Sequence, residues 1–217
     1  MRLLYLNPNA TAAMTEGVVS VARAALPQAE VLGWTNTSGP PAIQGPEDGS
    51  MAVAGLMAML PAAQAAQADV IVIACFDDTG LAQLRTAAHC PVIGIGQAAY
   101  HMASLLGHRF SVVTTLAVSV PVIEGNIASS GFAPLCSKVR ASGLGVLEVD
   151  AASPATRARL TAEIAAAARQ DDVAAVILGC AGMAQLADDL QSRTSLRLID
   201  GVCASARLAI ALQTTQF

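Results

Sequence analysis

The sequence predicts an α/β protein of two pseudo-symmetric halves, each a four-stranded, mainly parallel sheet flanked by helices, with the candidate active site in the cleft between them. Short apolar runs alternate along the 217 residues with longer stretches typical of helices, the pattern of parallel strands joined by helical crossovers. Two of the runs end at a cysteine, Cys75 and Cys180, and turn-forming residues follow each one. Because open α/β sheets bind ligands at the carboxyl ends of their strands, both cysteines are expected at a ligand site.

The two halves repeat with a common offset. Cys75 and Cys180 are 105 residues apart, and so are Gly96 and Gly201, each of which follows the next predicted strand. A shared offset indicates an internal repeat of the fold. If the strand ends of the two halves face each other, both cysteines line a single cleft.

The N-terminal half, residues 1–97, is expected to be completed by the C-terminal helix at about 203–217. Residues 7–11 (NPNAT) end the first strand and cap the first helix. The long loop at 35–46 is too rich in turn-forming residues for regular structure. The predicted elements are strand 3–6, helix 12–25, strand 30–34, helix 48–67, strand 70–73 with Cys75 at its end, helix 81–87 and strand 92–95.

The C-terminal half, residues 98–202, repeats this plan. Ser153 is a favourable N-cap and Pro154 suits the first helical position, so the two residues open a long helix. The predicted elements are helix 97–106, strand 110–114, helix 115–130, a weaker strand within 134–141, helix 154–170, a strand that ends at Cys180, helix 184–191, strand 196–199 and a last helix from 202.

Composition excludes several classes of protein. Hydrophobic residues make up 54% of the chain, yet no apolar run is long and uninterrupted enough to span a bilayer. The net charge of −4 comes without a basic cluster, which argues against nucleic-acid binding. The first residues lack the features of a signal peptide. We therefore expect a cytoplasmic protein with a small-molecule substrate, and the apolar, alanine-rich composition favours a homo-oligomer.

No metal or cofactor site is visible in the sequence. The five cysteines are widely spaced, which fits neither a disulfide framework nor a zinc site, and the three histidines fall away from the strand ends. A redox disulfide is disfavoured because neither Cys75 nor Cys180 has Cys-x-x-Cys spacing. Residues 94–99 (GIGQAA) lack the third glycine of a dinucleotide-binding loop. The remaining cysteines are interpreted as packing residues: Cys90, Cys136 and Cys203.

Two thiols on opposite walls of a cleft suit a proton transfer across a carbon atom. A thiolate becomes a competent base when its pKa falls from about 8.5 toward neutrality, which a helix N-terminus can bring about. One thiolate would take a proton from one face of the carbon while the other thiol returns a proton to the opposite face. Such a reaction is a racemisation, and it needs no cofactor if the substrate itself stabilises the carbanion.

Six motifs follow one another along almost the whole chain: residues 7–11 (NPNAT), 39–45 (GPPAIQG), 74–78 (ACFDD), 91–96 (PVIGIG), 178–183 (LGCAGM) and 199–202 (IDGV). Together they resemble the aspartate/glutamate racemase superfamily and, within it, the hydantoin and allantoin racemases. The amino-acid racemases of the superfamily usually carry polar residues directly after each cysteine, whereas Phe76 and residues 181–183 follow here. These less polar surroundings suit a neutral ring better than the charged ends of an amino acid.

The resemblance implies a cofactor-independent racemase of 5-substituted hydantoins, allantoin included, with Cys75 and Cys180 as its two catalytic bases. It implies that the substrate contacts ten further residues: Asn7, Asn9, Ile43, Phe76, Asp77, Thr114, Thr115, Gly179, Ala181 and Gly182. Three alternatives remain open. They are an amino-acid racemase on the same fold, a non-catalytic small-molecule binding module, and a related decarboxylase or isomerase, which typically keeps only one of the two thiols.

Several charged residues also have a purely structural interpretation. Asp77 and Asp78 are expected to cap the helix that follows them rather than to act as acids. Glu148 and Asp150 are expected to be solvated loop charges. Four positions within or directly after the motifs depart from the residues common among relatives, which bears on the shape of the pocket: Ala42, Gln44, Thr79 and Gln97.

Overall fold

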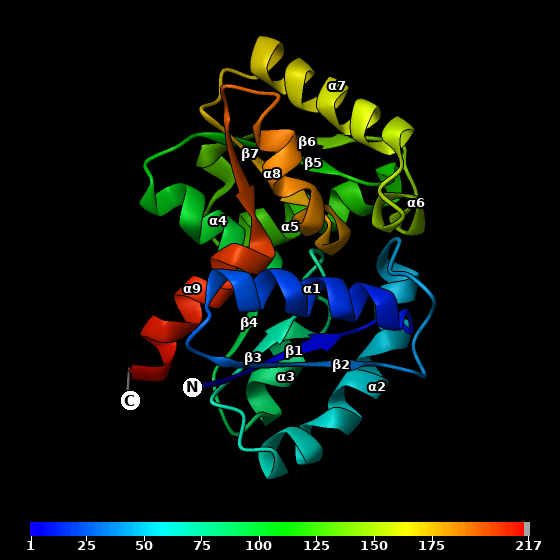
Figure 1. Ribbon diagram of the computed structural model, residues 1–217, viewed down its shortest axis with the longest axis vertical. Coiled ribbons are helices and arrows are strands. Elements are labelled where there is room, and N and C mark those ends of the chain that lie inside the picture. Colours follow the sequence, from blue (N-terminus) through cyan, green and yellow to red (C-terminus); the bar gives the residue numbers. More distant parts are fainter. Residues whose placement is uncertain (215–217) are drawn as a thin grey trace.

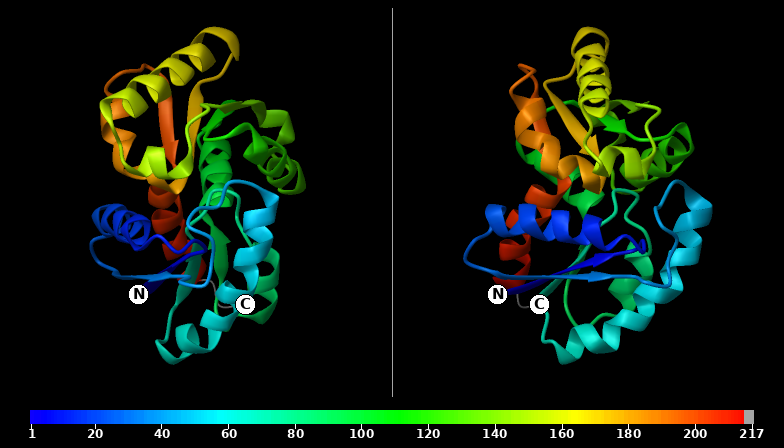
Figure 2. Two further views of the ribbon diagram at one scale, coloured as in Figure 1. Left: turned by 90° about the vertical axis from the view of Figure 1, so that its right-hand side faces the viewer. Right: turned by 45° about the vertical axis from the view of Figure 1, so that its right-hand side comes forward.

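The structure is a computed structural model, and it describes residues 1–214. Two α/β halves are stacked on each other, with the N-terminal sheet below and the C-terminal sheet above (Figure 1). From further directions α7 (Pro154–Gln170) remains at the end of the molecule farthest from the N-terminal sheet (Figure 2). Residues 215–217, which belong to the predicted C-terminal helix, lie outside the described residues.

The N-terminal sheet has four parallel strands in the order β2-β1-β3-β4. Its elements are β1 (Arg2–Asn7), α1 (Ala12–Ala25), β2 (Glu30–Thr35), α2 (Pro46–Ala65), β3 (Val70–Ile73), α3 (Leu81–Ala87) and β4 (Val92–Gly94). All four residues of β3 are buried, as expected of an apolar strand covered by helices on both faces.

The C-terminal sheet has the equivalent order β6-β5-β7-β8, again with parallel pairing throughout. Its elements are α4 (Ile95–Leu105), β5 (Phe110–Thr114), α5 (Val120–Ser129), β6 (Cys136–Ala141), α6 (Val146–Asp150), α7, β7 (Ala175–Gly179), α8 (Ala187–Gln191), β8 (Arg197–Asp200) and α9 (Gly201–Thr214). Three short 3-10 segments are η1 (Ala117–Ser119), η2 (Ala133–Leu135) and η3 (Ala181–Leu186). The predicted fold class is confirmed.

The strand orders locate the ligand site of each half. In both sheets the direction of chain progression reverses between two central strands, β1 and β3 in one sheet and β5 and β7 in the other. At such a switch point a crevice opens beyond the carboxyl ends of the strands, where open α/β sheets bind ligands. The two thiols predicted to be functional follow β3 and β7, so one lies at each switch point.

The two halves share a core. One buried apolar cluster contains residues of both sheets together with α1, α4 and α9. α9 follows the last strand of the upper sheet but packs against α1 and α4, and the hydroxyl of Tyr5 in β1 donates a 3.1 Å hydrogen bond to the carbonyl of Val202. The residue limits of the two halves stay a prediction. Within residues 1–214 no helix is long and apolar enough to cross a membrane.

Some elements differ in detail from the sequence-based expectation. The helix predicted at 48–67 begins at Pro46, because proline suits the first turn and the acidic residues after it favour a helix N-terminus. The helix predicted at 115–130 begins as the 3-10 segment η1, and the helix predicted at 184–191 begins as η3. Helix α6 was not predicted, since five residues are too few for a hydrophobic period to be recognised.

Candidate active site

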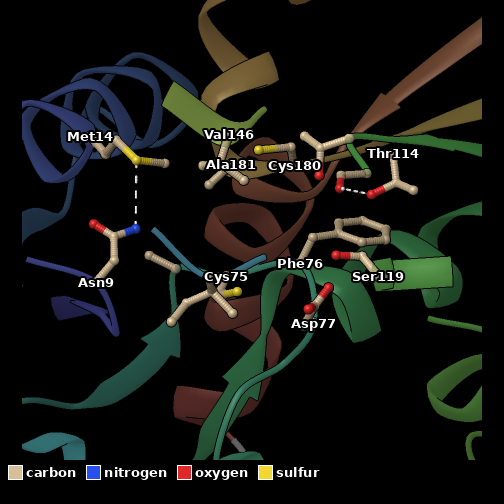
Figure 3. A pocket seen from close by; sticks show the side chains of 14 residues that line it. Asn9, Met14, Cys75, Phe76, Asp77, Thr114, Ser119, Val146, Cys180 and Ala181 are labelled. Atoms are coloured by element: carbon tan, nitrogen blue, oxygen red, sulfur yellow. Dashed lines mark hydrogen bonds between the residues drawn. The ribbon is translucent and has the colours of Figure 1, made fainter. Parts of the chain in front are cut away.

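A cavity lies between the two halves, where the carboxyl ends of β1, β3, β5 and β7 meet (Figure 3). Fourteen residues line it: Asn9, Met14, Ile43, Ala74, Cys75, Phe76, Asp77, Thr114, Thr115, Ser119, Val146, Gly179, Cys180 and Ala181. Both switch points contribute to this lining, so the two sheets build one site together.

Ten of the twelve predicted site residues line this cavity, and Asn7 and Gly182 do not. Asn7 is buried and has a structural task, because its amide donates 3.0 Å hydrogen bonds to Asn9 Oδ1 and Thr15 Oγ1 and so holds the turn after β1. Gly182 lies against α6, where an added Cβ would be 3.4 Å from the backbone of Asp150.

The two thiols occupy opposite walls of the cavity. Cys75 follows β3 and approaches the cavity from the N-terminal half, while Cys180 follows β7 and approaches it from the C-terminal half (Figure 3). Cys180 is only 8% exposed, and Cys75 is partly exposed. A flat ligand held between these walls would present one face to each sulfur.

The turn after β3 orients Cys75. Asp78 adopts a left-handed backbone with a φ of 49°, and Gly80 follows with a φ of 72°, a conformation that suits glycine. The carboxylate of Asp78 accepts hydrogen bonds from the backbone N–H groups of Gly96 at 2.9 Å and Gln97 at 2.7 Å. Asp78 therefore caps α4, the helix that follows the neighbouring strand β4. The expectation that it caps α3, the next helix in sequence, is wrong.

Asp77 is also not a cap for α3. The N-cap of α3 is Gly80, and within residues 1–214 no donor binds the carboxylate of Asp77, which instead lines the cavity (Figure 3). Only its backbone is held, since Asn126 Nδ2 donates a 2.8 Å hydrogen bond to the Asp77 carbonyl. Burial raises the pKa of Asp77 to about 7. A carboxyl group near half ionisation at neutral pH thus faces the site.

The thiols are more weakly acidic than the sequence suggested. Burial raises the pKa of Cys180 to about 12, although the backbone N–H groups of Gly182 and Met183 act in the opposite direction. Burial also raises the pKa of Cys75 well above its ordinary value, and the negative charge of Asp77 adds to this effect. Desolvation penalises the thiolate more than the donors at the two turns stabilise it, so the expected lowering toward neutrality is not found.

Hydroxyl groups supply the remaining polar lining. Thr114 donates a 2.9 Å hydrogen bond to the carbonyl of Gly179 and so joins the ends of β5 and β7. Thr115 and Ser119 are buried, and no hydrogen bond to another side chain of the described chain occupies their hydroxyls. These two groups can turn toward a ligand carbonyl or N–H.

Four lining residues were missed from the sequence: Met14, Ala74, Ser119 and Val146. Met14 lies on α1, one turn beyond the Asn9 motif, and its sulfur accepts a 3.5 Å hydrogen bond from Asn9 Nδ2. Val146 begins the unpredicted helix α6.

Nearby, the expectation of solvated loop charges is wrong for Asp150, one of whose carboxylate oxygens is buried without a hydrogen-bond partner in residues 1–214. Glu148 instead caps α6, accepting a 2.7 Å hydrogen bond from Gly145 N–H.

The cavity is small. The centre of a water-sized sphere can occupy only about 20 Å³ of it, which is room for about one water molecule. The long loop before α2 borders it and is joined to the C-terminal half, because Gln44 Oε1 accepts a 3.0 Å hydrogen bond from Val146 N–H. This bond holds the loop against the C-terminal half beside the cavity.

Comparison with known proteins agrees with this architecture. The family model described as Asp/Glu/Hydantoin racemase matches residues 3–209. The chain belongs to this family. Among curated members, a hydantoin racemase of Rhizobium meliloti is 41% identical over 213 residues, which cover 98% of this chain and 88% of the relative. The resemblance found in the sequence motifs is thereby confirmed.

Solved structures of the same family share the fold along the whole chain. An allantoin racemase from Klebsiella pneumoniae superposes with a TM-score of 0.93 at 36% identity, covering 98% of this chain and 87% of that one. An allantoin racemase from Pseudomonas fluorescens gives a TM-score of 0.89 at 33% identity and covers 98% and 90% of the two chains. The chain thus resembles family members named for ring substrates across nearly its full length.

Proposed function

We propose that the protein is an isomerase that racemises 5-substituted hydantoins, allantoin included, without a cofactor. The observation that carries this proposal is the placement of Cys75 and Cys180 on opposite walls of one cavity, each supplied by a different sheet. The similarity to a hydantoin racemase and to two allantoin racemases supports the substrate class.

In the proposed reaction the C5 hydrogen of the ring is acidic because a carbonyl group and a ring nitrogen adjoin C5. The thiolate of one cysteine removes this proton, and the electron pair moves into the carbonyl to give an enolate. The thiol of the other cysteine then donates its proton to C5 from the opposite face. Backbone N–H groups at the two strand ends, with Thr115 and Ser119, are suited to hold the ring carbonyls and the developing oxyanion.

The raised thiol pKa values have a kinetic consequence for this scheme. At neutral pH only a small fraction of the protein carries a thiolate at Cys75 or Cys180, so the rate is expected to increase with pH. The fraction that does carry a thiolate holds a stronger base than an exposed cysteine would provide. Weak acidity of the thiols therefore lowers the population of the reactive state without removing the chemistry.

The charge of the cavity favours a neutral ring over an amino acid. Of the described side chains that line it, none is basic, and Asp77 is the only one with a carboxyl group. A carboxylate accepts hydrogen bonds from the N–H groups that a hydantoin ring or a ureido group offers, but it repels the carboxylate of an amino acid. To bind the carboxylate of its substrate, an amino-acid racemase would need a basic side chain or a strong hydrogen-bond donor at this place.

The test is exchange of the C5 proton in D₂O, followed by NMR together with the decay of optical rotation. The panel contains allantoin, alkyl and aryl hydantoins, aspartate and glutamate. Exchange and racemisation of hydantoins with none of the amino acids supports the proposal. Exchange of aspartate or glutamate alone would establish an amino-acid racemase, and binding without exchange of any compound would establish a binding module.

Cofactor independence is tested separately. Activity is expected to survive exhaustive dialysis against a chelator and to be unaffected by added pyridoxal phosphate, because the proposed proton transfers use only the two thiols. A loss of activity that added metal restores would contradict this part of the proposal. Within residues 1–214 no three His, Cys, Asp or Glu side chains gather as metal ligands would.

We also propose that the protein forms a homo-oligomer and works in the cytoplasm. An apolar groove between α4 and α9 is lined by Leu105, Phe132, Leu208 and Leu212, and Leu105 is 73% exposed. Exposed apolar surface of this kind is commonly covered by a protein partner. All five cysteines are free thiols, which suits a reducing compartment. Light scattering at working concentration tests the association, and a monomer at every concentration would exclude it.

A further inference from the structure

We propose that Thr79 is a positioning residue for Cys75, and that its hydroxyl orients the sulfur and stabilises the thiolate by donating a hydrogen bond. The kinetic consequence of this inference depends on the proposed racemase function, because it concerns the base that removes a proton. The thiol chemistry itself does not, and it is measurable without any substrate.

The contact that carries the inference is a hydrogen bond within the turn after β3. Thr79 Oγ1 lies 3.5 Å from Cys75 Sγ, a normal length for a hydroxyl donating to sulfur. Thr79 is only 6% exposed, so water does not compete freely for its hydroxyl. Among the described residues, Cys75 Sγ is the acceptor that the structure gives this hydroxyl.

The turn holds Thr79 in place from both sides. Before it, Asp78 is fixed by its two hydrogen bonds to the N-terminus of α4, and its N–H donates a 3.0 Å hydrogen bond to the carbonyl of Cys75. After it, Leu81 N–H donates a 3.1 Å hydrogen bond to the carbonyl of Asp78. The backbone on both sides of Thr79 is therefore held in place.

Helix α2 leaves room for this arrangement. Gly49 of α2 lies next to Thr79, and a Cβ added at Gly49 would be in ordinary contact, 3.9 Å from both Cγ2 and Oγ1 of Thr79. The methyl and hydroxyl groups of Thr79 thus lie beside α2 without a steric clash. Valine, which has the same shape, would fill this space equally well but could not donate to the thiol.

The electrostatic surroundings make such a donor consequential. The titratable groups that face Cys75 are Asp77 on the same turn and Cys180 across the cavity, and both disfavour a thiolate there. Two donors oppose them, the Thr79 hydroxyl and the backbone N–H of Asp77. Of the described side chains that line the cavity none is basic, so no cation supplies the missing stabilisation.

The second thiol, Cys180, has different hydrogen-bond donors. Cys180 faces two backbone donors, from Gly182 and Met183, and no side-chain hydroxyl is hydrogen-bonded to its sulfur in the described chain. Both thiols nevertheless line the same cavity. Removing the Thr79 hydroxyl should therefore change Cys75 alone, and Cys180 serves as an internal control for access to the cavity.

The first test measures alkylation by iodoacetamide at each cysteine across a range of pH, read by peptide mapping. Thr79→Val is expected to slow labelling of Cys75 about tenfold at a fixed pH below the thiol pKa, which corresponds to a pKa raised by about one unit. Thr79→Ser keeps a hydroxyl and should restore the wild-type rate. Thr86→Val, a matched change on the exposed face of α3, should have no effect.

The labelling rate of Cys180, the internal control, decides how this test is interpreted. Slower labelling of Cys75 with unchanged labelling of Cys180 supports the inference. Equal slowing at both thiols would mean that Thr79→Val changes opening of the cavity, and an unchanged rate at Cys75 would mean that the hydroxyl does not act on the thiolate. Either of these two results overturns the proposal.

The second test uses single-thiol backgrounds and C5 proton exchange in D₂O. In Cys180→Ser, where Cys75 is the remaining base, adding Thr79→Val should slow exchange about tenfold and shift the pH profile upward. In Cys75→Ser the same change should leave exchange by Cys180 unaltered. Equal slowing in both backgrounds contradicts the inference. Absence of exchange in the wild-type protein contradicts the proposed function instead, and the alkylation result then still decides the role of Thr79.

Discussion

The carboxylate of Asp78, in the turn after β3, accepts a 2.7 Å hydrogen bond from the backbone N–H of Gln97, in the first turn of α4. This bond joins the turn that carries Cys75 to the helix that leads from the first sheet into the second. The approach is tight, since a Cβ at Gly94 would lie 1.8 Å from Asp78 Oδ1. Asp78 thus ties the turn that carries Cys75 to the start of α4.

Asp78→Ala should therefore destabilise the protein. The change leaves two N–H groups of α4 without their acceptor, and loss of an N-cap acceptor costs about 1–2 kcal/mol. Urea unfolding at pH 5, where the buried carboxyl group is protonated and no charge is desolvated, should show this decrease in the free energy of unfolding. Asp78→Asn retains one acceptor oxygen and should lose less. Equal stability of Asp78→Ala and the wild-type protein would show that the bonds to α4 contribute nothing.

The buried carboxyl groups predict how stability varies with pH. Burial raises the pKa of Asp77 and of Asp78 from 3.8 to about 7, so each group favours the folded state while protonated. This contribution is fully present below about pH 4 and is lost as the pH rises to about 7, because the unfolded chain ionises first. The free energy of unfolding should fall across that window, whereas the lowered pKa of Asp171 acts below it.

Asp77→Asn isolates one of these groups. The amide cannot ionise, so the variant should show a shallower fall in the free energy of unfolding between pH 4 and pH 7. Urea titrations at several pH values measure the slope directly. A slope identical to that of the wild-type protein would mean that Asp77 ionises in the folded state as easily as in the unfolded chain.

The assignment of one base to each face predicts the behaviour of the cysteine variants. Cys75→Ser and Cys180→Ser should each abolish racemisation, because a serine hydroxyl is far too weak an acid to serve as a base near neutral pH. Each variant keeps one thiol, which can remove and return a proton on its own face. In D₂O each should therefore exchange the C5 proton of one enantiomer only, and the two should select opposite enantiomers. Selection of the same enantiomer by both, or wild-type racemisation by either, would contradict two-base catalysis.

The hydrogen bond from Val146 N–H to Gln44 Oε1 predicts how firmly the loop before α2 is held beside the cavity. Gln44→Leu removes the acceptor that joins the loop before α2 to the C-terminal half, so hydrogen exchange of the Val146 amide should accelerate about two- to tenfold, the usual worth of one hydrogen bond. Mass spectrometry of the peptide containing Val146 measures the rate. Gln83→Leu, on the exposed face of α3, is the matched control. An unchanged rate would show that Gln44 does not hold the loop against the C-terminal half.

Much of this protein was predictable from local sequence. Apolar runs such as residues 70–73 specify buried strands by themselves, because four consecutive apolar residues leave no polar face. The common offset of Cys75 and Cys180 then placed both thiols at equivalent strand ends, and the motifs around them identified the family. Parallel topology follows from the alternation of strands with helices, which leaves few other arrangements.

The tertiary structure alone decided the roles of Asp77 and Asp78. The two residues are identical and adjacent, so no sequence pattern separates a carboxylate that caps a distant helix from one that faces the cavity. The difference arises from the left-handed backbone at Asp78 and from the position of α4, whose first N–H groups lie within reach only after the sheet has formed. Residues distant in sequence had to be packed together first.

The acidity of the thiols was decided in the same way. The sequence correctly placed Cys75 and Cys180 beside turns that offer hydrogen-bond donors, which by themselves lower a thiol pKa. Folding also buries the two thiols in a cavity that apolar residues such as Ile43 and Val146 line, and the cost of desolvating a thiolate exceeds the gain from the donors. Local sequence therefore determined which chemical groups the site contains. Burial, a property of the whole chain, determined their ionisation.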